Sequence, residues 1–143
     1  MKRKDTYLLL TLATLVLAFC SCNRDRQKEA IREAAYGYII TTGNYQLDEA
    51  AAYASKVTRE HTLPFLKDTI LPLVDSSFLA ASVPATATID TILVKNDTAW
   101  VGYTKTTPLG KTQGTLTMVQ EEGKWLAYVP LDLPAPATPS EEP

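Results

Sequence analysis

Two cysteines, Cys20 and Cys22, have the types and spacing that could support covalent or redox chemistry. They stand one residue apart in the stretch LAFCSCNRD, where an apolar run gives way to charged residues. A disulfide between them would close a very small, strained ring, and the chain has no third cysteine to offer another pairing. A metal site would need further ligands nearby, but the only histidine, His61, lies far along the chain. A third interpretation is a point where the chain is cut and attached to something.

Asp90 is the carboxylate whose setting suggests chemistry. In the stretch TATIDTILV, the two-residue period of a strand places Asp90 on one face with Thr88, Ile92 and Val94. An acidic group on a covered apolar face would have a raised pKa, which suits a general base. The alternative is that this face is the solvated side of an antiparallel sheet.

Aromatic residues on the same predicted strands are candidates for a ligand pocket. Trp100 and Trp125 can line a pocket or fill the core, where each would bury a large apolar area. With Asp90 and Tyr103, they are the residues that we expect around a ligand. His61, beside a predicted helix start, is expected at the surface or in a helix cap. The sequence has no nucleophile elbow, phosphate loop or metal-ligand spacing, so we expect no metal and no other cofactor.

The N-terminus has the features of a secretory signal peptide. Lys2, Arg3 and Lys4 form a basic head, and the apolar stretch YLLLTLATLVLAF follows at residues 7–19. This run is shorter than the roughly 20 residues that a membrane span needs. We therefore expect residues 1–21 to be a signal peptide that is removed, with an uncleaved anchor as the alternative.

The stretch Phe19-Cys20-Ser21-Cys22 resembles the lipobox of bacterial lipoproteins, in which a small residue precedes an acylated cysteine. Ser21 supplies that small residue before Cys22. The resemblance implies that Cys22 receives a diacylglyceryl group and becomes the first residue of the mature chain, held on a membrane by its acyl chains. The commonest lipobox has Leu three residues before the cysteine and Ala, Ser or Thr two before, where this chain has Phe19 and Cys20. Cys20 therefore stays open as the alternative acceptor.

Composition divides the rest of the chain into three parts. Residues 22–28 are charged and are predicted to be a tether between lipid and domain. Residues 29–133 are long enough for one domain with its own core. Residues 134–143 are rich in Pro and acidic residues and are predicted to be an extended tail.

The first half of the predicted domain is helical. Apolar spacing and Ala-rich composition predict segments at 29–43, at 47–56, from 58 or 62 until Pro72, and a last turn at 76–81. Gly43 is the expected stop of the first helix. Thr58 or Thr62 is the expected cap of the third segment, and Pro72 is expected to end or kink it.

The second half alternates like strands. The expected strands are 85–95, 98–106, 115–120 and 124–131, joined by turns at 96–97, 108–114 and 121–123. Short connections predict an antiparallel meander whose one face is covered by the preceding helices, which makes the domain α+β.

Helices followed by a long-stranded meander resemble the NTF2-like superfamily. More narrowly, YIITTGNYQLDEAAAYAS at residues 38–55 resembles the small NTF2-like or cystatin-like lipoproteins of Gram-negative envelopes. The resemblance implies two to three helices packed on a curved four-stranded sheet that forms a cone, and it makes a homodimer paired through the sheets plausible. Enzymes of the superfamily place an Asp or His base deep in the cone near Tyr residues, but no spacing here matches such a set.

Charge excludes one class of partner. The chain carries 14 Lys and Arg against 16 Asp and Glu, a net charge of −2, and loss of residues 1–21, with three basic residues and Asp5, would bring the mature chain to about −4. This balance gives no basis for binding nucleic acid.

We expect a lipid-anchored binding or interaction module for a small apolar ligand or an envelope partner, and the alternative is a small isomerase- or dehydratase-type enzyme.

Acidic residues directly after the lipid cysteine direct some lipoproteins to the cell surface, and NRDR lacks such a run. We therefore expect the outer membrane, facing the periplasm.

Intact mass of the membrane-extracted protein tests the attachment site. We expect wild type to carry the lipid mass and to begin at Cys22, and we expect Cys22→Ala to lose the lipid. Cys20→Ala is the matched control and should be lipidated normally. Unlipidated wild type would contradict the lipoprotein prediction, and loss of lipid in Cys20→Ala alone would move the site to Cys20.

Overall fold

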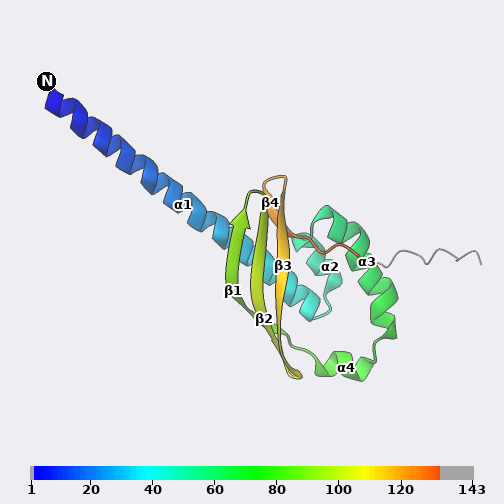
Figure 1. Ribbon diagram of the computed structural model, residues 1–143. Coiled ribbons are helices and arrows are strands. Elements are labelled where there is room, and N and C mark those ends of the chain that lie inside the picture. Colours follow the sequence, from blue (N-terminus) through cyan, green and yellow to red (C-terminus); the bar gives the residue numbers. More distant parts are fainter. Residues whose placement is uncertain (1, 133–143) are drawn as a thin grey trace, which may run out of the picture.

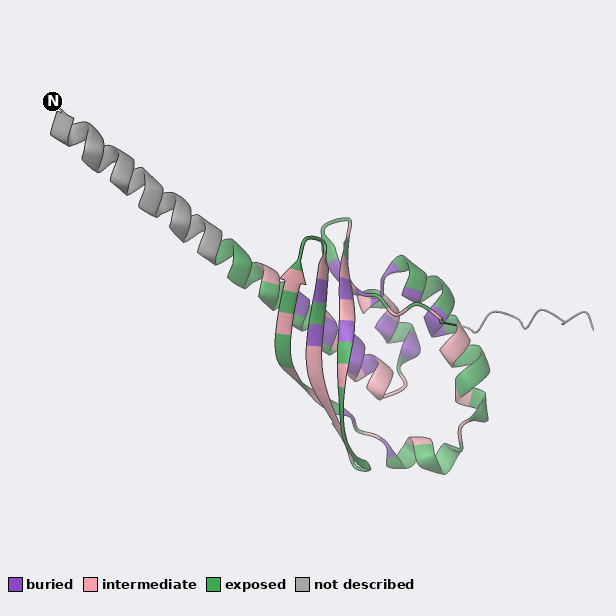
Figure 2. Ribbon diagram, viewed as in Figure 1, coloured by how far each residue is buried: buried purple, intermediate pink, exposed green. Residues whose placement is uncertain are grey.

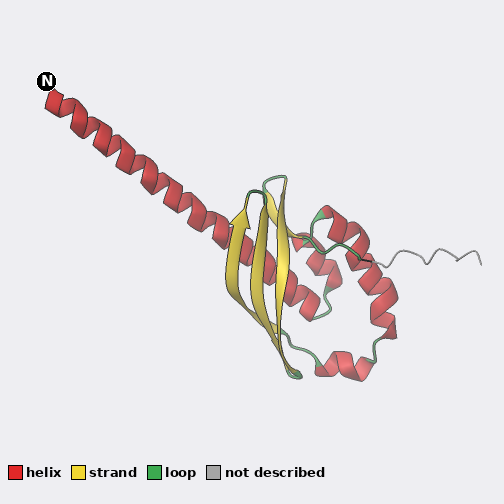
Figure 3. Ribbon diagram, in the orientation of Figure 1, coloured by secondary structure: helices red, strands yellow, loops and turns green. Residues whose placement is uncertain are grey.

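Helices come first in the chain and strands second, as the sequence predicts (Figures 1 and 3). The computed structural model describes the backbone of residues 2–132 and the side chains of residues 22–132. The elements are α1 (Lys2–Gly43), α2 (Leu47–Ala50), η1 (Ala51–Tyr53), η2 (Thr58–Thr62), α3 (Leu63–Phe65), η3 (Leu66–Ile70), η4 (Leu71–Leu73), α4 (Ser76–Ala81), β1 (Thr86–Lys95), β2 (Thr98–Thr107), β3 (Gly110–Glu121) and β4 (Lys124–Ala127). The strands form one antiparallel sheet in the order β1-β2-β3-β4, so the predicted α+β class with a four-stranded meander is confirmed.

The core lies between the C-terminal part of α1 and the concave face of the sheet (Figures 1 and 2). The predicted apolar stripe of α1 is confirmed, since Ile31, Ala35, Tyr38 and Ile39 are all buried. Full burial of a side chain the size of Ile31 contributes about 2 kcal/mol. Residues 22–28, the predicted tether, continue α1 as helix. The predicted signal peptide, residues 1–21, and the predicted tail, residues 134–143, lie outside the residues whose side chains are described.

The end of α1 at Gly43 is confirmed, but the way in which the helix is closed differs from the prediction. Gly43 is the last residue of the helix, but the left-handed residue that closes it is Tyr45, with φ 60°. The N–H of Gln46 donates to the carbonyl of Thr41 at 2.8 Å, and the N–H of Tyr45 donates to that of Thr42 at 3.1 Å. These two bonds form a Schellman motif in which Tyr45 takes the place usually held by Gly.

Gly43 is needed for packing rather than for the turn. A Cβ on Gly43 would lie 2.9 Å from the Cβ of Ala85 and 3.4 Å from the Cδ of Lys105. The side chain of Asn44 ties the same two segments together, because its Oδ1 accepts the N–H of Ala85 at 2.8 Å and its Nδ2 donates to the carbonyl of Ile40 at 2.9 Å. The chain entering β1 is therefore held against the end of α1.

The second helix is shorter than predicted. It ends at Tyr53 rather than near residue 56, because Ala54 is extended and pairs with Ala127 as a parallel bridge beside β4. Ser55 then donates its N–H to the carbonyl of Ala127 at 2.9 Å. Pairing with a distant strand overrides the local helix propensity of this Ala-rich segment.

The predicted caps of the third helical segment are also wrong. Ser55 occupies the cap position, since its Oγ accepts the N–H of Thr58 at 3.4 Å. Thr58 and Thr62 are instead buried in the helical run, where they bind the backbone of Val129. The N–H of Val129 donates to the Thr58 hydroxyl at 2.8 Å, and the Thr62 hydroxyl donates to the Val129 carbonyl. This pair ends β4 earlier than expected and fixes the chain that leaves it.

The strands pair over longer stretches than predicted between β2 and β3. Residues 110–114 were expected in a connection, but they form the start of β3, with Gly110 opposite Thr107 and Gly114 opposite Tyr103. Their ladder satisfies backbone groups that a longer loop would leave to solvent. The lack of a side chain at Gly114 leaves space for the ring of Tyr103, because a Cβ there would lie 2.6 Å from the Tyr103 hydroxyl.

Gly37 offers a test of the packing on α1. A Cβ at this position would collide with the ring of Tyr53, although Ala is otherwise favoured over Gly within a helix by about 1 kcal/mol. We expect Gly37→Ala to lower the free energy of unfolding by about 1–2 kcal/mol in urea titrations, because overpacking outweighs helix propensity. In a Tyr53→Ala background the same change should be stabilising. A stabilising effect with Tyr53 in place would contradict the packing described.

Candidate functional site

The four residues predicted around a pocket are divided between the two faces of the sheet. Tyr103 and the buried Trp125 lie on the inner face, whereas Asp90 and Trp100 lie on the outer face and are exposed. Trp125 borders a cavity between α1 and the turn before β4, which Asn23 and Arg26 also line. The structure therefore does not bring these four residues together.

The predicted face of Asp90 is wrong because of a β-bulge. The register between β1 and β2 shifts between Ile89 and Thr91, so that Ile92 and Val94 face inward while Asp90 faces outward. The carboxylate of Asp90 accepts a hydrogen bond from the hydroxyl of Thr104 at 2.7 Å. The alternative interpretation, a solvated sheet face, describes its position.

The outer face carries an exposed apolar row. The strand registers bring Leu93, Trp100 and Thr117 side by side, and the N–H of Tyr128 donates to the carbonyl of Thr117 at 2.8 Å. Leu93 is 66% exposed and Trp100 37% exposed. Trp100 thus lies on the outer surface of the sheet and not in a pocket. The homodimer and the envelope partner remain predictions.

Inside the cone, Tyr38 and Tyr103 are neighbours. Burial, and then the nearby phenol of Tyr103, raise the pKa of Tyr38 to about 12. Tyr38 is therefore a neutral phenol at neutral pH. Helix α1 fills the space around these two rings. The open space of the fold lies beyond Gly43, at the end of α1.

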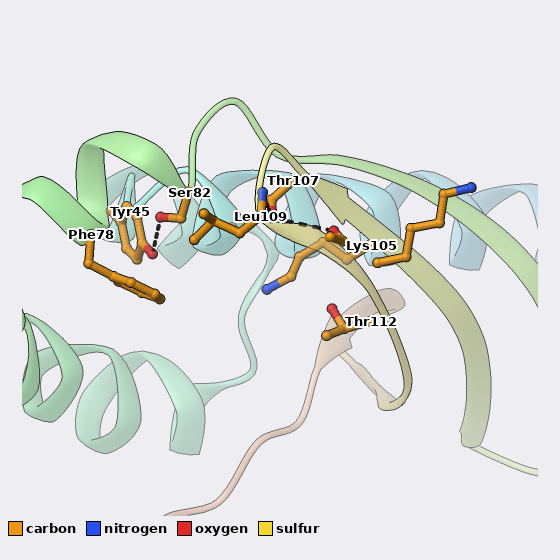
Figure 4. A pocket seen from close by; sticks show the side chains of 10 residues that line it. Tyr45, Phe78, Ser82, Lys105, Thr107, Leu109 and Thr112 are labelled. Carbon is orange, nitrogen blue, oxygen red and sulfur yellow. Dashed lines mark hydrogen bonds between the residues drawn. The ribbon is translucent and has the colours of Figure 1, made fainter.

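The wide end of the cone holds two adjoining cavities. The first, here called the lysine chamber, measures about 390 Å³ and lies between the β2–β3 hairpin tip, α4 and the end of α1 (Figure 4). The second, here called the apolar chamber, measures about 240 Å³, is partly open, and lies between the end of α1 and the helical residues from α2 to α4. Tyr45 and Phe78 line both chambers, so the two share a wall.

The apolar chamber is lined by aliphatic side chains. They come from α2, from the consecutive helical turns η2 to η4 (residues 58–73, here called the helical arc), and from the chain that continues into α4: Leu47, Leu66, Ile70, Leu71, Val74 and Leu79. Thr42 and Tyr45 are the residues of its described lining that carry hydroxyl groups. The Thr42 hydroxyl donates a hydrogen bond to the carbonyl of Tyr38 at 2.6 Å. A cavity with such walls favours hydrocarbon over polar groups.

The wall shared by the chambers is fixed from two sides. The Schellman motif at the end of α1 holds Tyr45 in its left-handed conformation, and the Tyr45 hydroxyl is hydrogen-bonded to the hydroxyl of Ser82 at 2.7 Å (Figure 4). Asp75 caps α4 by accepting the N–H groups of Ser77 and Phe78, which sets the position of Phe78. A left-handed conformation costs a non-glycine residue about 1 kcal/mol or more, and such residues cluster at ligand sites.

Lys105 gives the lysine chamber its charge. The alternation of β2 places it on the inner face with Val101 and Tyr103, and its stem lies over Gly43. Thr112 lies directly opposite on β3, and Lys111 is a second lysine on the same lining. Lys105 is half-buried, and within residues 22–132 it takes part in no ion pair.

The carboxylates and the histidine that could act as a general base lie outside the two chambers. His61, Asp68 and Asp90 are exposed, and Asp75 is occupied as the cap of α4. Neither chamber has an acidic residue or a histidine among its described lining. Within the same part of the chain, no three His, Cys, Asp or Glu side chains lie close enough to hold a metal ion.

The sequence carried a signal for one of the residues that were missed. Lys105 continues the inward alternation Ala99, Val101, Tyr103, so a charged residue stands on the covered face of a strand. Tyr45 and Phe78 gave no such signal, because their roles depend on the turn after α1 and on the path of the chain into α4.

The N-terminal predictions have less structural support. Cys22 is exposed and free. Of the helices whose residues the structure describes with side chains, none is long and apolar enough to cross a membrane.

Comparisons with known proteins identify the fold. No protein-family model and no curated protein match the chain. A solved NTF2-like protein of unknown function from Shewanella baltica matches with a TM-score of 0.51 and 14% identity, over 71% of this chain and 88% of that one. A second solved chain, with a name that begins Rd1NTF2, matches at a TM-score of 0.43 and 15% identity, over 73% of this chain and 94% of that one; this likeness carries no argument. The protein has an NTF2-like fold, and the likeness shows the fold alone.

The cap of α4 can be tested through its pH dependence. Hydrogen bonds from the Ser77 hydroxyl, then from the N–H groups of Phe78 and Ser77, hold the pKa of Asp75 below its ordinary value of 3.8. Because the folded pKa is lowered, the stabilisation is complete above the unfolded pKa and is lost as the pH falls through the folded value. We expect the hydrogen-exchange protection of Ser77 and Phe78 to be constant above about pH 5 and to decline below about pH 4.

Two variants separate this effect from general acid unfolding. Asp75→Asn keeps an acceptor at the cap but does not titrate, so the local decline should disappear. Asp75→Ala should lower protection at every pH. A decline of the same size in Asp75→Asn and wild type would show that Asp75 is not its cause.

Proposed function

We propose that this protein is a lipid-anchored cell-envelope protein that binds a small, largely apolar ligand in the apolar chamber. The observation that carries the binding role is the chamber itself, a partly open cavity of about 240 Å³ lined mostly by aliphatic side chains. It is somewhat below the range of about 300–1,000 Å³ common for ligand sites, and it shares the wall formed by Tyr45 and Phe78 with the larger lysine chamber.

Binding is favoured over catalysis by the chemistry of the walls. A general base must lie within hydrogen-bond reach of the proton that it removes. The Asp and His side chains of the described residues lie on the outer sheet face, in a helix cap or at the surface, away from both chambers. The isomerase- or dehydratase-type alternative lacks support from the site for this reason.

The lipid anchor is supported by the sequence before residue 23. We propose Cys22 as the lipidated residue, and the outer membrane facing the periplasm as the location. Helix α1 leads from Cys22 to Gly43, over a length of about 30 Å at roughly 1.5 Å per residue. Gly43 lines the lysine chamber, so an anchor at Cys22 would leave the chambers well away from the lipid.

Photo-crosslinking tests whether the apolar chamber binds a ligand. The probe is a diazirine-bearing decanol, offered to the full chain in phosphatidylcholine nanodiscs, and mass spectrometry locates the label. We expect labelling within residues 66–79. Val74→Trp should fill the chamber and reduce labelling at least tenfold, because Val74 lines it.

Leu73→Trp is the matched control. It introduces the same ring one residue earlier, at a side chain that is 80% exposed and that does not line the chamber. Its labelling should equal that of wild type. Labelling spread over the whole chain, or equal loss in both variants, would overturn the proposed binding site.

A further inference from the structure

The two chambers differ in chemistry although they share a wall. The apolar chamber presents hydrocarbon, whereas the lysine chamber is lined by Lys105 and by several hydroxyl-bearing residues. Tyr45 and Phe78 lie between them and belong to both linings. A ligand that passes this wall would meet apolar surface at one end and positive charge at the other.

We infer that the ligand is an anionic amphiphile, whose hydrocarbon part occupies the apolar chamber and whose acidic head lies at Lys105 in the lysine chamber. This inference rests on the proposed binding function and specifies the chemical class of the ligand. The acidic head can be a carboxylate, a sulfate or a phosphate ester, because each offers oxygen acceptors with negative charge to an ammonium group.

The position of Lys105 is the main argument for a negative head. Lys105 is half-buried on the inner face of β2, where its ammonium group can bind an oxygen acceptor with negative charge. Lys105 has no acidic partner among the residues described with side chains, and no carboxylate lines its chamber. An anion from outside the chain would supply the missing partner.

The surroundings of Lys105 suit an anion as well. Thr112, opposite on the neighbouring strand, adds a hydroxyl that can donate a hydrogen bond. Because the chain as a whole is net negative, the positive charge at Lys105 is a feature of the chamber and not of the protein surface in general.

The rim of the site fits an amphiphile rather than a fully polar anion. Phe78 is 53% exposed and Leu109 is 56% exposed, and both line the lysine chamber. Figure 4 shows Leu109 of the hairpin tip facing the side of the chamber that holds Phe78, Tyr45 and Ser82. Apolar side chains beside an ammonium group are matched by a molecule that carries both kinds of surface.

The test compares a charged probe with a neutral probe of the same length. Diazirine-bearing decanoate and diazirine-bearing decanol are titrated at pH 8 on the full chain in phosphatidylcholine nanodiscs, with empty nanodiscs as the reference for partitioning. We expect Lys105→Met, which keeps the length of the stem, to need about tenfold more decanoate for half-maximal labelling of residues 66–79. The decanol curve should not change.

Two further variants complete the design. Lys95→Met removes an exposed lysine of β1 outside both chambers and should leave both curves unchanged. Lys105→Arg keeps the charge and should hold the decanoate curve within about twofold of wild type, which separates loss of charge from loss of folding.

The outcomes distinguish the inference from the function on which it rests. Two outcomes would overturn the inference that the ligand has an acidic head: equal decanoate curves for wild type and Lys105→Met, or labelling by decanol but not by decanoate. Neither outcome would contradict the proposed binding in the apolar chamber. Labelling of residues 66–79 by neither probe would overturn both.

Discussion

The structure depends on the burial of one face of α1 against the concave side of the sheet. Ile31 and Ala35 on the helix, and Val101 and Met118 on the strands, are completely buried. This contact needs a helix with an apolar stripe and a sheet curved enough to follow it. It also leaves the wide end of the cone, beyond Gly43, for the helical arc and α4 to cover.

Polar contacts join distant parts of the chain. Asn44 ties the end of α1 to the start of β1, and Thr58 and Thr62 bind both backbone groups of Val129. Each satisfies a backbone group that leaves regular structure, where an unpaired buried group would cost about 1–3 kcal/mol. Asn44 follows Gly43, which lines the lysine chamber, so one wall of that chamber is held by a contact that is not itself part of the site.

The predicted pocket shows how a short local feature changes a site. An unbroken alternation in β1 would have placed Asp90 with Ile92 and Val94, but one bulge turned it to the solvent. A bulge adds a residue without a strong sequence signature, so period counting cannot detect it. The predicted cap at Thr58 or Thr62 was wrong for a related reason: both hydroxyls bind the backbone of Val129, about 70 residues later in the chain.

The sequence by itself determined the order of the elements, the buried stripe of α1, the strand turns at Asn96 and Glu122, and the last helical turn at Ser76–Ala81. These are local matters of period, propensity and turn chemistry. Only the tertiary structure decided which residues surround a cavity. Tyr45, Phe78 and Lys105 lie on three separate elements, and no pattern within any one of them records that packing brings the three together.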